Sequence, residues 1–377
     1  MIESLRLQNF KCFEDQKLSV GGLTLLSGLN GAGKSSVLQS LLLLRQSWQQ
    51  GLLKGGRLAL NGDLVQIGTA KDALYGGAKV EQIGISLSFE GGGEAVWEFV
   101  YDLDADVLST SVGANAMALD PGIASQNLFS GIFQYLCAER LGPRTSFGTS
   151  DFAVRHNRSL GPRGEFTAHY LTIFGQEKIQ VDAVEHPKAT SNRLYAQVEA
   201  WMDVISPGTR IKLTSHAAMD LVQLQYQFVS GTDLTDPYRP TNVGFGLTYT
   251  LPILVAVLTA RPGSLVLIEN PEAHLHPRGQ ARMGELLALA ASGGVQVILE
   301  THSDHVLNGV RVAVYEGRLS PELTKIHFFN RREVADRAIH EVVSPMMDRD
   351  GRIDPWPAGF FDEWDAALDR LLSSPKR

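Results

Sequence analysis

Gly28-Leu29-Asn30-Gly31-Ala32-Gly33-Lys34-Ser35 is the stretch of sequence that decides the fold. It follows a short apolar run, Leu23–Leu26, which is typical of a buried strand. It precedes a segment whose apolar residues recur at helical spacing, at Val37, Leu41, Leu44 and Trp48. Between a strand and a helix, glycines let successive backbone N–H groups point into one concavity, and the helix adds the positive end of its dipole. The stretch therefore predicts a binding loop for the phosphates of a nucleotide.

The spacing within this loop matches a known phosphate-binding motif, in which four residues separate a first glycine from Gly-Lys-Ser. Lys34 is expected to reach the β- and γ-phosphates, and the Ser35 hydroxyl to ligate Mg²⁺. We expect ATP and Mg²⁺ as cofactors; no Asn-Lys-x-Asp motif for reading guanine is present. A chance match is the alternative, which the flanking strand and helix disfavour. The residues expected to contact the nucleotide are Asn30, Gly31, Ala32, Gly33, Lys34, Ser35 and Ser36.

An acidic residue follows a second apolar run, Leu265–Ile268, which predicts another buried strand. Glu269 comes next, and a phosphate loop requires a metal ligand on a neighbouring strand. Glu269 is therefore the candidate carboxylate on the Mg²⁺ side, directly or through water. A surface glutamate is the alternative, but ligands bind at the carboxyl ends of such sheets. Asn270 is adjacent, yet a neutral amide is a poor proton acceptor, so Glu272 is the candidate base for hydrolysis.

A histidine follows a third apolar run, Val295–Leu299, in the sequence Glu300-Thr301-His302-Ser303. We expect His302 to contact the γ-phosphate and to sense its presence; a polar residue at a strand end is the alternative. His302 also joins His274, His276 and His305 in a pattern that allows a zinc site. Zinc is disfavoured because no cysteine accompanies these histidines.

The bulk properties describe an ordinary globular chain of 377 residues, with 44% hydrophobic and 20% charged residues. The net charge of −7 gives no overall basic field, so nucleic acid remains open as a partner without being indicated. The run Leu251–Ala260 is too short to span a bilayer, which needs about 20 apolar residues. We therefore expect a cytoplasmic protein without a membrane segment, in which two distant cysteines stay reduced.

Strands that alternate with helices predict an α/β fold with a mixed, largely parallel sheet. Alternating residues on both sides of Gly91-Gly92-Gly93 predict an antiparallel hairpin. We expect four segments: residues 1–104 as an N-terminal lobe with the phosphate loop and the hairpin, 105–240 as a helical or mixed insertion, 241–340 as a C-terminal lobe, and 341–377 as a tail packed on the head.

The order of these motifs resembles the ABC-type ATPases of the SMC, RecF and OLD group. It resembles more narrowly the small stand-alone prokaryotic AAA-family ATPases of anti-phage defence and genome maintenance. The resemblance rests on the phosphate loop, on Ile-Glu-Asn-Pro-Glu-Ala-His-Leu-His-Pro from Ile268, and on Glu-Thr-His-Ser from Glu300. The opening Leu5-x-Leu7-x-Asn9-Phe10-Lys11, Ala138–Arg144 and the closing residues from Trp356 to Asp362 add to it. It implies a P-loop NTPase with an ABC-ATPase-like head.

Further roles are implied by this resemblance alone. Thr241–Gly246 falls where the family has its signature loop, so that Asn242, Gly244 and Gly246 would close over the γ-phosphate bound by a second subunit. Ala273–His276 would communicate across the dimer, and Gln66 would reach Mg²⁺ or the attacking water. Arg140 would serve either as a structural ion-pair partner or as a phosphate contact. Glu269 replaces the usual metal-binding aspartate, and Asn270 replaces a glutamate that many relatives use in catalysis, which suits slow turnover.

Three functions follow as hypotheses. The favoured one is an ATP-dependent homodimeric switch that sandwiches ATP and gates a partner effector, a nuclease in anti-phage defence or DNA maintenance. The second is a self-contained nuclease of the OLD type, for which Asp348, Asp350 and Asp354 would bind a cation unless they form a solvated turn. The third, a transporter ATPase subunit, is disfavoured because the Leu-Ser-Gly-Gly-Gln signature is absent.

Overall fold

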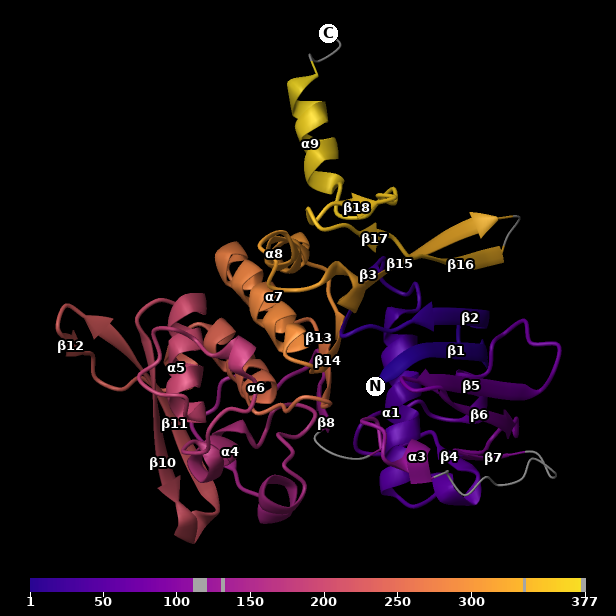
Figure 1. The fold of residues 1–377 in the computed structure, drawn as a ribbon. Coiled ribbons are helices and arrows are strands. Elements are labelled where there is room, and N and C mark those ends of the chain that lie inside the picture. The colour runs from indigo at the N-terminus through magenta and orange to yellow at the C-terminus, as the bar shows by residue number, and fades with distance from the viewer. Residues whose placement is uncertain (111–120, 130–132, 335–336, 374–377) are drawn as a thin grey trace.

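A six-stranded sheet forms the centre of the molecule, and the computed structural model describes it within residues 1–110, 121–129, 133–334 and 337–373 (Figure 1). Its order is β16-β15-β3-β14-β13-β8. Neighbours from β15 to β8 pair in parallel, and only β16 is antiparallel. The strands are β3 (Leu23–Gly28), β8 (Phe133–Leu136), β13 (Leu265–Glu269), β14 (Gln296–Glu300), β15 (Thr324–Val334) and β16 (Arg337–Val343). The predicted α/β class with a mixed, largely parallel sheet is confirmed.

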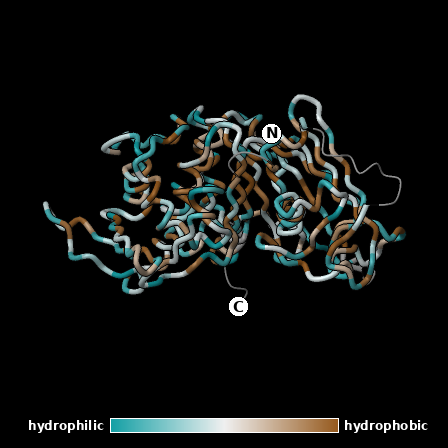
Figure 2. The backbone as a smooth tube through the Cα atoms, turned by 90° about the horizontal axis from the view of Figure 1, so that it is seen from below, coloured by the Kyte–Doolittle hydropathy of each residue, from teal (hydrophilic) through white to brown (hydrophobic). Residues whose placement is uncertain are grey.

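The two faces of this sheet pack into different cores, because successive side chains of a strand point to opposite faces. On β3, Leu25 joins the core formed with α6 (Phe245–Leu258), α7 (Pro277–Ser292) and α8 (Asp304–Tyr315). The neighbouring Leu26 joins the core formed with α1 (Lys34–Gln49) and the N-terminal strands. Figure 2 shows the hydrophobic residues gathered in the strands between the two lobes. The phosphate loop therefore leaves a strand that is buried on both faces.

A four-stranded antiparallel sheet covers the α1 side, in the order β2-β1-β5-β6. The predicted hairpin is β5–β6, in which Ile85 lies opposite Trp97 and Leu87 opposite Ala95. The elements of this lobe are β1 (Ile2–Phe10), β2 (Phe13–Ser19), β4 (Arg57–Ala59), α2 (Ala70–Ala73), β5 (Gln82–Phe89), β6 (Gly93–Val100) and β7 (Val107–Ser109). The turn between β1 and β2 approaches the phosphate loop, since the Lys11 ammonium donates to the Gln39 amide on α1.

Residues 105–240, the expected insertion, contribute strands to both the N-terminal lobe and the central sheet. Strand β7 pairs with β4 of the N-terminal lobe, and β8 is an edge of the central sheet. The rest packs against α6 and contains both helices and a long hairpin. Its elements are α3 (Pro121–Ala124), β9 (Phe147–Gly148), α4 (Thr167–Phe174), α5 (Leu194–Ile205), β10 (Thr209–His216), β11 (Leu221–Ser230) and β12 (Asp233–Leu234). The proposed insertion is therefore mixed and reaches the head through β8.

The C-terminal segment only partly packs on the head. Phe360 is fully buried and its ring meets those of Phe328 and Trp356 edge-on. Beyond it, α9 (Glu363–Leu372) projects away from the body, and Leu371 and Leu372 are exposed (Figure 1). The remaining strands, β17 (Met346–Met347) and β18 (Ile353–Asp354), form a small antiparallel pair. Phe360 thus anchors this segment on the head, whereas α9 extends away from it. Within the described residues no helix is both long and apolar enough to cross a membrane.

A buried histidine on β15 makes the stability of the fold depend on pH. The His327 ring accepts or donates at both nitrogens, to the Ser344 hydroxyl and to the Ser19 carbonyl. Because a carbonyl only accepts, the Nε2 proton stays on the ring facing Ser19. Burial lowers the pKa of His327 below its usual value near 6.5, against the opposing effect of the Ser19 hydrogen bond.

We expect the free energy of unfolding to fall as the pH drops below about 6.5. The reason is that His327 then binds a proton in the unfolded chain but not in the folded chain. The contribution of His327 to stability is fully present above the pKa that its ring has in the unfolded chain. It is lost as the pH falls toward the lower pKa of the ring in the folded chain. Urea unfolding at pH 7.5 and 5.5 measures it. In His327→Gln the difference between the two pH values should shrink, whereas the exposed His216→Gln should leave it unchanged. An equal pH dependence in wild type and His327→Gln would contradict this assignment.

Candidate nucleotide-binding site

The phosphate loop joins the end of β3 to the start of α1, and two of its glycines are required by their surroundings. Gly28 and Gly33 have positive φ angles of 132° and 114°. A Cβ on Gly28 would lie 2.0 Å from the carbonyl oxygen of Phe329, and one on Gly33 would lie 2.5 Å from the Phe13 ring. Gly31 also has positive φ but faces open space. Packing against β15 and β2 therefore shapes the loop before any phosphate binds.

Lys34 lies inside this loop and is only 3% exposed. Its ammonium donates to the carbonyl oxygens of Gly28 and Leu29, at 3.0 and 2.9 Å. Burial lowers the pKa of Lys34, and the nearby carboxylate of Glu300 partly opposes this shift. The ammonium group of Lys34 is thus held within the loop. Phosphate oxygens of a bound nucleotide would replace the two backbone carbonyls as its hydrogen-bond acceptors.

The carboxylate beside the loop belongs to Glu300, the last residue of β14. It accepts a hydrogen bond of 2.9 Å from the Ser35 hydroxyl, and it lies 3.8 Å from the Lys34 ammonium. Burial raises the pKa of Glu300, while Lys34 and Ser35 oppose that shift. The sequence shows the same signal here as at Glu269, an acidic residue after a buried apolar run, but Glu300 is not among the residues predicted for the site. The two strand ends are paired, Glu269 opposite Glu300.

Glu269, the predicted carboxylate on the Mg²⁺ side, turns instead toward β8. One of its oxygens accepts from the Tyr135 hydroxyl at 2.8 Å, and the other from the Ala138 N–H at 3.0 Å. Burial, and then the charge of Glu269, raise the pKa of Tyr135, so that this phenol stays a donor. The structure therefore places Glu300, and not Glu269, in direct contact with Ser35, because the side chain of Glu269 is already bound by two donors.

Arg140 fastens the turn that follows β13. The guanidinium is almost fully buried and donates to the carbonyl oxygens of Cys137, Glu269 and Asn270. It also lies over the ring of Tyr249 on α6, 5.4 Å from the centroid. These contacts give Arg140 a structural role through backbone carbonyls, and not through the ion pair that was one of its two expected roles. Asn270 adopts the left-handed conformation, with φ of 46°, that asparagine tolerates better than most residues.

Glu272, the candidate base, bridges to the segment after β14. Its two oxygens accept from the Thr301 hydroxyl and from the backbone N–H of His302, each at 2.7 Å. These bonds hold the two loops at the carboxyl ends of β13 and β14 together. His302 itself lies at the surface, and partial desolvation of its ring, followed by the charge of Lys34, lowers its pKa. A neutral imidazole at this place suits a hydrogen bond to a γ-phosphate.

The proposed signature loop lies at the N-terminus of α6, where Asn242 and Gly244 are exposed. Gly246 packs against the turn after β13, since a Cβ there would lie 2.6 Å from the carbonyl oxygen of His274. The ring of His274 meets that of Tyr249 at 4.7 Å, and the exposed Phe245 lies beside both. The proposed signature loop and the turn after β13 thus lie together on one surface. Among the described residues, neither of them contacts the chain's own phosphate loop.

Gly246→Ala is expected to destabilise the protein by about 1–3 kcal/mol, because the new methyl group collides with backbone that cannot rotate away. Gly244→Ala is the matched control: Gly244 has φ of −59°, and nothing lies within 4 Å of a Cβ there. Denaturant unfolding of the two variants measures the difference. Equal stability of the two variants would show that the backbone at His274 can move away from the new methyl group without loss of stability.

Two predicted nucleotide contacts are not supported by the arrangement. Gln66 is exposed and follows Val65, whose N–H bonds to the Gln46 side chain about three turns along α1 from Ser35. The structure does not bring Gln66 to the phosphate loop. Ser36 is buried, and it opposes the rise that burial causes in the pKa of the Cys12 thiol. The side chain of Ser36 therefore packs against the β1–β2 turn and leaves only its backbone for a phosphate.

The two alternative metal sites find no support in the described part of the chain. No group of three or more histidine, cysteine, aspartate or glutamate side chains there is arranged to hold a metal ion. One oxygen of Asp348 instead accepts from the backbone N–H groups of Asp350 and Arg352. The acidic segment is thus a hydrogen-bonded turn at the surface.

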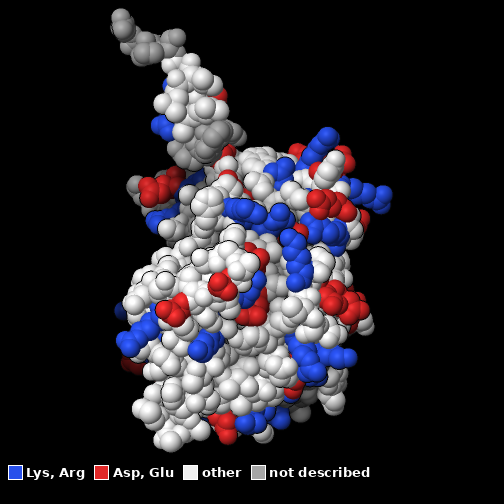
Figure 3. All heavy atoms as spheres, turned by 90° about the vertical axis from the view of Figure 1, so that its left-hand side faces the viewer, with Lys and Arg blue, Asp and Glu red and all other residues white. Residues whose placement is uncertain are grey.

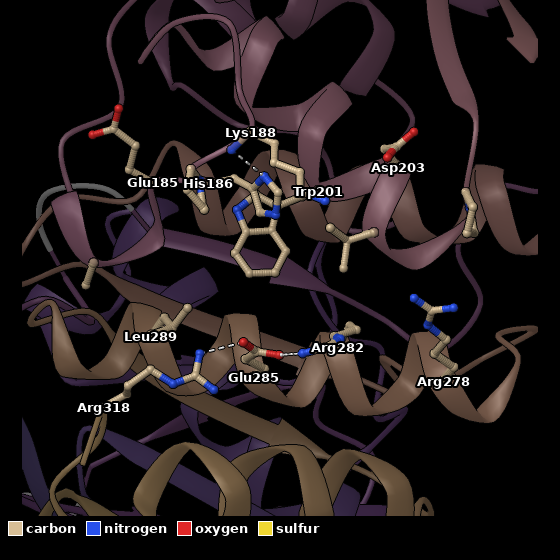
Figure 4. A pocket seen from close by; sticks show the side chains of 14 residues that line it. Glu185, His186, Lys188, Trp201, Asp203, Arg278, Arg282, Glu285, Leu289 and Arg318 are labelled. Carbon is tan, nitrogen blue, oxygen red and sulfur yellow. Dashed lines mark hydrogen bonds and ion pairs between the residues drawn. The ribbon is translucent and has the colours of Figure 1, made fainter. Parts of the chain in front are cut away.

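Charge on the surface is mixed rather than one-sided. On the face shown in Figure 3, basic and acidic side chains are interspersed. A hollow of about 580 Å³ between α5 and α7 is lined by both kinds, and in it Glu285 accepts from Arg282 and Arg318 (Figure 4). These ion pairs account for most of the basic groups that Figure 4 shows near Glu285, so this hollow does not form a basic groove.

Three family descriptions match separate parts of the chain. Residues 1–74 match "AAA ATPase domain", and residues 159–308 match "AAA domain, putative AbiEii toxin, Type IV TA system". Residues 319–371 match "Protein of unknown function (DUF3696)". The first two matches contain the phosphate loop, Glu269 and Glu300, and the third contains the β15–β16 hairpin.

Known proteins share a short stretch of sequence or the fold. An OLD nuclease of Thermus scotoductus is 43% identical over 49 residues, which are 13% of this chain and 9% of that protein. The chain thus matches less than a tenth of the length of this relative. An SMC head bound to the C-winged helix domain of ScpA is 14% identical, with a TM-score of 0.57 over 92% of this chain and 98% of that one. The SMC head domain of Thermotoga maritima is 13% identical, with a TM-score of 0.45 over 91% and 98%.

Proposed function

We propose that this chain, an ABC-type ATPase of the SMC and OLD kind, binds ATP with Mg²⁺ and uses it to control assembly. The observation that carries the proposal is the loop between β3 and α1, in which Lys34 and Ser35 meet Glu300. Backbone N–H groups at a helix N-terminus and a buried cation favour a polyphosphate. The glycine geometry of this loop is set by packing, so that binding needs little rearrangement.

The residues at the loop fit a Mg²⁺ ion. Ser35 and Glu300 bring two oxygen ligands together, and Mg²⁺ usually takes one or two protein oxygens beside phosphates and water. Glu300 is buried beside Lys34 and Ser35, and an oxygen of its carboxylate lies next to the Ser35 hydroxyl, where a divalent cation would be ligated by both. When bound, Mg²⁺ neutralises charge that develops on the β- and γ-phosphates. Ser35 and Glu300 would hold it, and Glu269 would act through water.

We propose slow hydrolysis because the residues expected near the γ-phosphate lack a carboxylate that is free to accept a proton from the attacking water. Asn270 cannot take a proton, and both oxygens of Glu272 are occupied by Thr301 and His302. Glu272 would then position His302, which would contact the γ-phosphate and report its presence. Turnover would depend on a water molecule that Asn270 and His302 orient.

The dimer is proposed from the exposed end of α6. The N–H groups of Gly244 and its neighbours at the exposed N-terminus of α6 would form a second anion site. In a symmetric pair, each α6 end would face the γ-phosphate held by the other chain. Asn242, Gly244 and Gly246 would complete the site in this way.

A mixing experiment tests the shared site. Lys34→Ala removes the phosphate contact of one chain, and Gly244→Asp places a carboxylate at the exposed start of α6, where a Cβ meets nothing. Each variant alone should be inactive. A 1:1 mixture should recover roughly a quarter of the wild-type ATPase rate, because half of the dimers hold one intact composite site. A mixture that stays inactive, although the two variants are shown to exchange subunits, would contradict a site shared between chains.

We propose further that the closed dimer gates a partner effector, a nuclease. The support is the 49-residue identity with an OLD nuclease and the fold shared with SMC heads, one of which is bound to a domain of ScpA. A nuclease within this chain is the second candidate. Plasmid cleavage by the purified chain with Mg²⁺ would favour that candidate, and its absence together with an ATP-dependent copurifying nuclease would favour the gate.

A further inference from the structure

We propose that α9 of one chain docks into a groove between α7 and α8 of a second copy of this chain, so that two copies exchange their C-terminal helices. This contact needs no nucleotide, and it therefore goes beyond the proposed ATP-dependent switch. It rests on two surfaces that match in polarity and in charge. One is the leucine face of α9, formed by Leu368, Leu371 and Leu372. The other is the α7–α8 groove, which is bordered by Arg278 and Arg282.

The leucine face lies on a helix that extends away from its own chain. Leu368, Leu371 and Leu372 have the i, i+3 and i+4 spacing that places residues on one side of a helix. Their exposed fractions are 37%, 81% and 74%, and α9 projects from the body beyond the buried Phe360 (Figure 1). Most of the stability of a short helix in a protein comes from packing its apolar side against another element. The leucine face is therefore a docking surface.

The α7–α8 groove is a hollow of about 290 Å³ with a mostly apolar lining. Ala281 of α7 lies in it with Gly309 and Val312 of α8, and Val312 is 49% exposed. A Cβ on Gly309 would lie 2.1 Å from the carbonyl oxygen of Ala281, so the two helices meet backbone to backbone at this point. Such close packing fixes the groove before a partner binds, and it leaves an apolar surface for leucine side chains.

The charges beside the two surfaces are opposite and have the same spacing. Arg278 and Arg282 lie one turn apart on α7, at the groove. Arg282 donates to Glu285, whereas the Arg278 side chain has no ion pair or hydrogen bond within the described residues (Figure 4). On α9 the exposed Asp369 follows Leu368, and the sequence places Asp365 one turn before it. Asp369 therefore fits Arg278 of a second copy when the leucine face enters the groove.

A second copy of the chain fits this arrangement better than α9 of the same chain. Leu371 and Leu372 are exposed, although the groove of the same chain is open. In a symmetric pair, each α9 enters the groove of the other chain, so that one pair of surfaces supplies two equal contacts. Exchange of an identical element is a low-cost route to a dimer, because both surfaces already exist on each chain.

The mass of the nucleotide-free chain, measured by sedimentation equilibrium, tests the exchange. At about 100 µM, where an interface of micromolar affinity is mostly formed, the wild type should be a dimer. Asp369→Arg and Arg278→Asp should each weaken the dimer at least about tenfold, because each places like charges opposite one another at both contacts. A 1:1 mixture of the two variants should restore the wild-type affinity, since opposite charges then face each other at both contacts. Asp233→Arg makes the same charge change as Asp369→Arg at an exposed residue of β12, and this matched control should leave the dimer unchanged.

A wild-type chain that stays monomeric at this concentration would overturn the exchange, and so would a dimer that neither charge variant weakens. A mixture of the two variants that fails to restore the dimer would also overturn it, because α9 then docks elsewhere. Lys34→Ala should keep the nucleotide-free dimer while it loses ATP binding, and loss of the dimer in that variant would contradict a contact made without nucleotide. A wild-type chain that dimerises in this way but binds no ATP would refute only the proposed function.

Discussion

Lys34→Ala is expected to weaken ATP binding by at least about 100-fold. The ammonium is buried in the loop, 3% exposed, and its two acceptors are backbone carbonyls that phosphate oxygens of a bound ATP would replace. Truncating one member of a buried, hydrogen-bonded charge pair costs about 2–5 kcal/mol, and each 1.4 kcal/mol corresponds to about a factor of ten. Alanine also leaves Glu300 as an uncompensated negative charge facing the phosphates. Equilibrium titration with a fluorescent ATP analogue measures the loss.

The control for this variant is Lys17→Ala, which removes an exposed lysine of β2 and the same formal charge. Its ATP affinity should be that of the wild type. The thermal unfolding of Lys34→Ala in the absence of nucleotide shows whether the loop still folds, since the variant loses two hydrogen bonds. A folded Lys34→Ala protein that keeps wild-type affinity would remove the loop from the proposed role.

Glu300→Gln is expected to abolish the dependence of ATP binding on Mg²⁺ and to lower hydrolysis by about 100-fold or more, the scale of losing one electrostatic contact to the transition state. Glutamine keeps the size of the side chain and can still bond to Ser35. It lacks the charge that a divalent cation requires. The measurement is ATP affinity with Mg²⁺ and with EDTA, followed by phosphate release at saturating ATP.

Glu269→Gln is the matched comparison, because Glu269 and Glu300 end paired strands. The Glu269 side chain bonds to Tyr135 and Ala138, and so this variant should keep most of the Mg²⁺ dependence and lose some stability. The reverse outcome, with Mg²⁺ dependence lost only in Glu269→Gln, would restore the assignment made from the sequence.

The strands and helices around the phosphate loop could be predicted from local sequence, because the sequence patterns that indicate them are short-range. The Gly28–Ser35 loop lies between β3 and α1 as expected, and the hairpin around Gly91 is present. The same applies to β13 and β14, which are buried on both faces and therefore apolar throughout.

The partners of the carboxylates could not be predicted, because they depend on strand order. Glu269 is held by Tyr135 of β8, which comes 134 residues earlier in the chain. Only the pairing of β8 with β13 shows that Glu269 turns to this edge and leaves the place beside Ser35 to Glu300.

The contacts of Arg140 link the two halves of the proposed composite site within one chain. Its guanidinium holds the carbonyls of Glu269 and Asn270 at the carboxyl end of β13, and it lies over Tyr249 of α6. In the proposed dimer, the end of that helix would face the second chain. A shift at one nucleotide would then displace the surface that completes the other site, so we expect ATP to bind cooperatively, with a Hill coefficient above one. In a variant that lacks the Arg140 side chain, this coefficient should fall toward one.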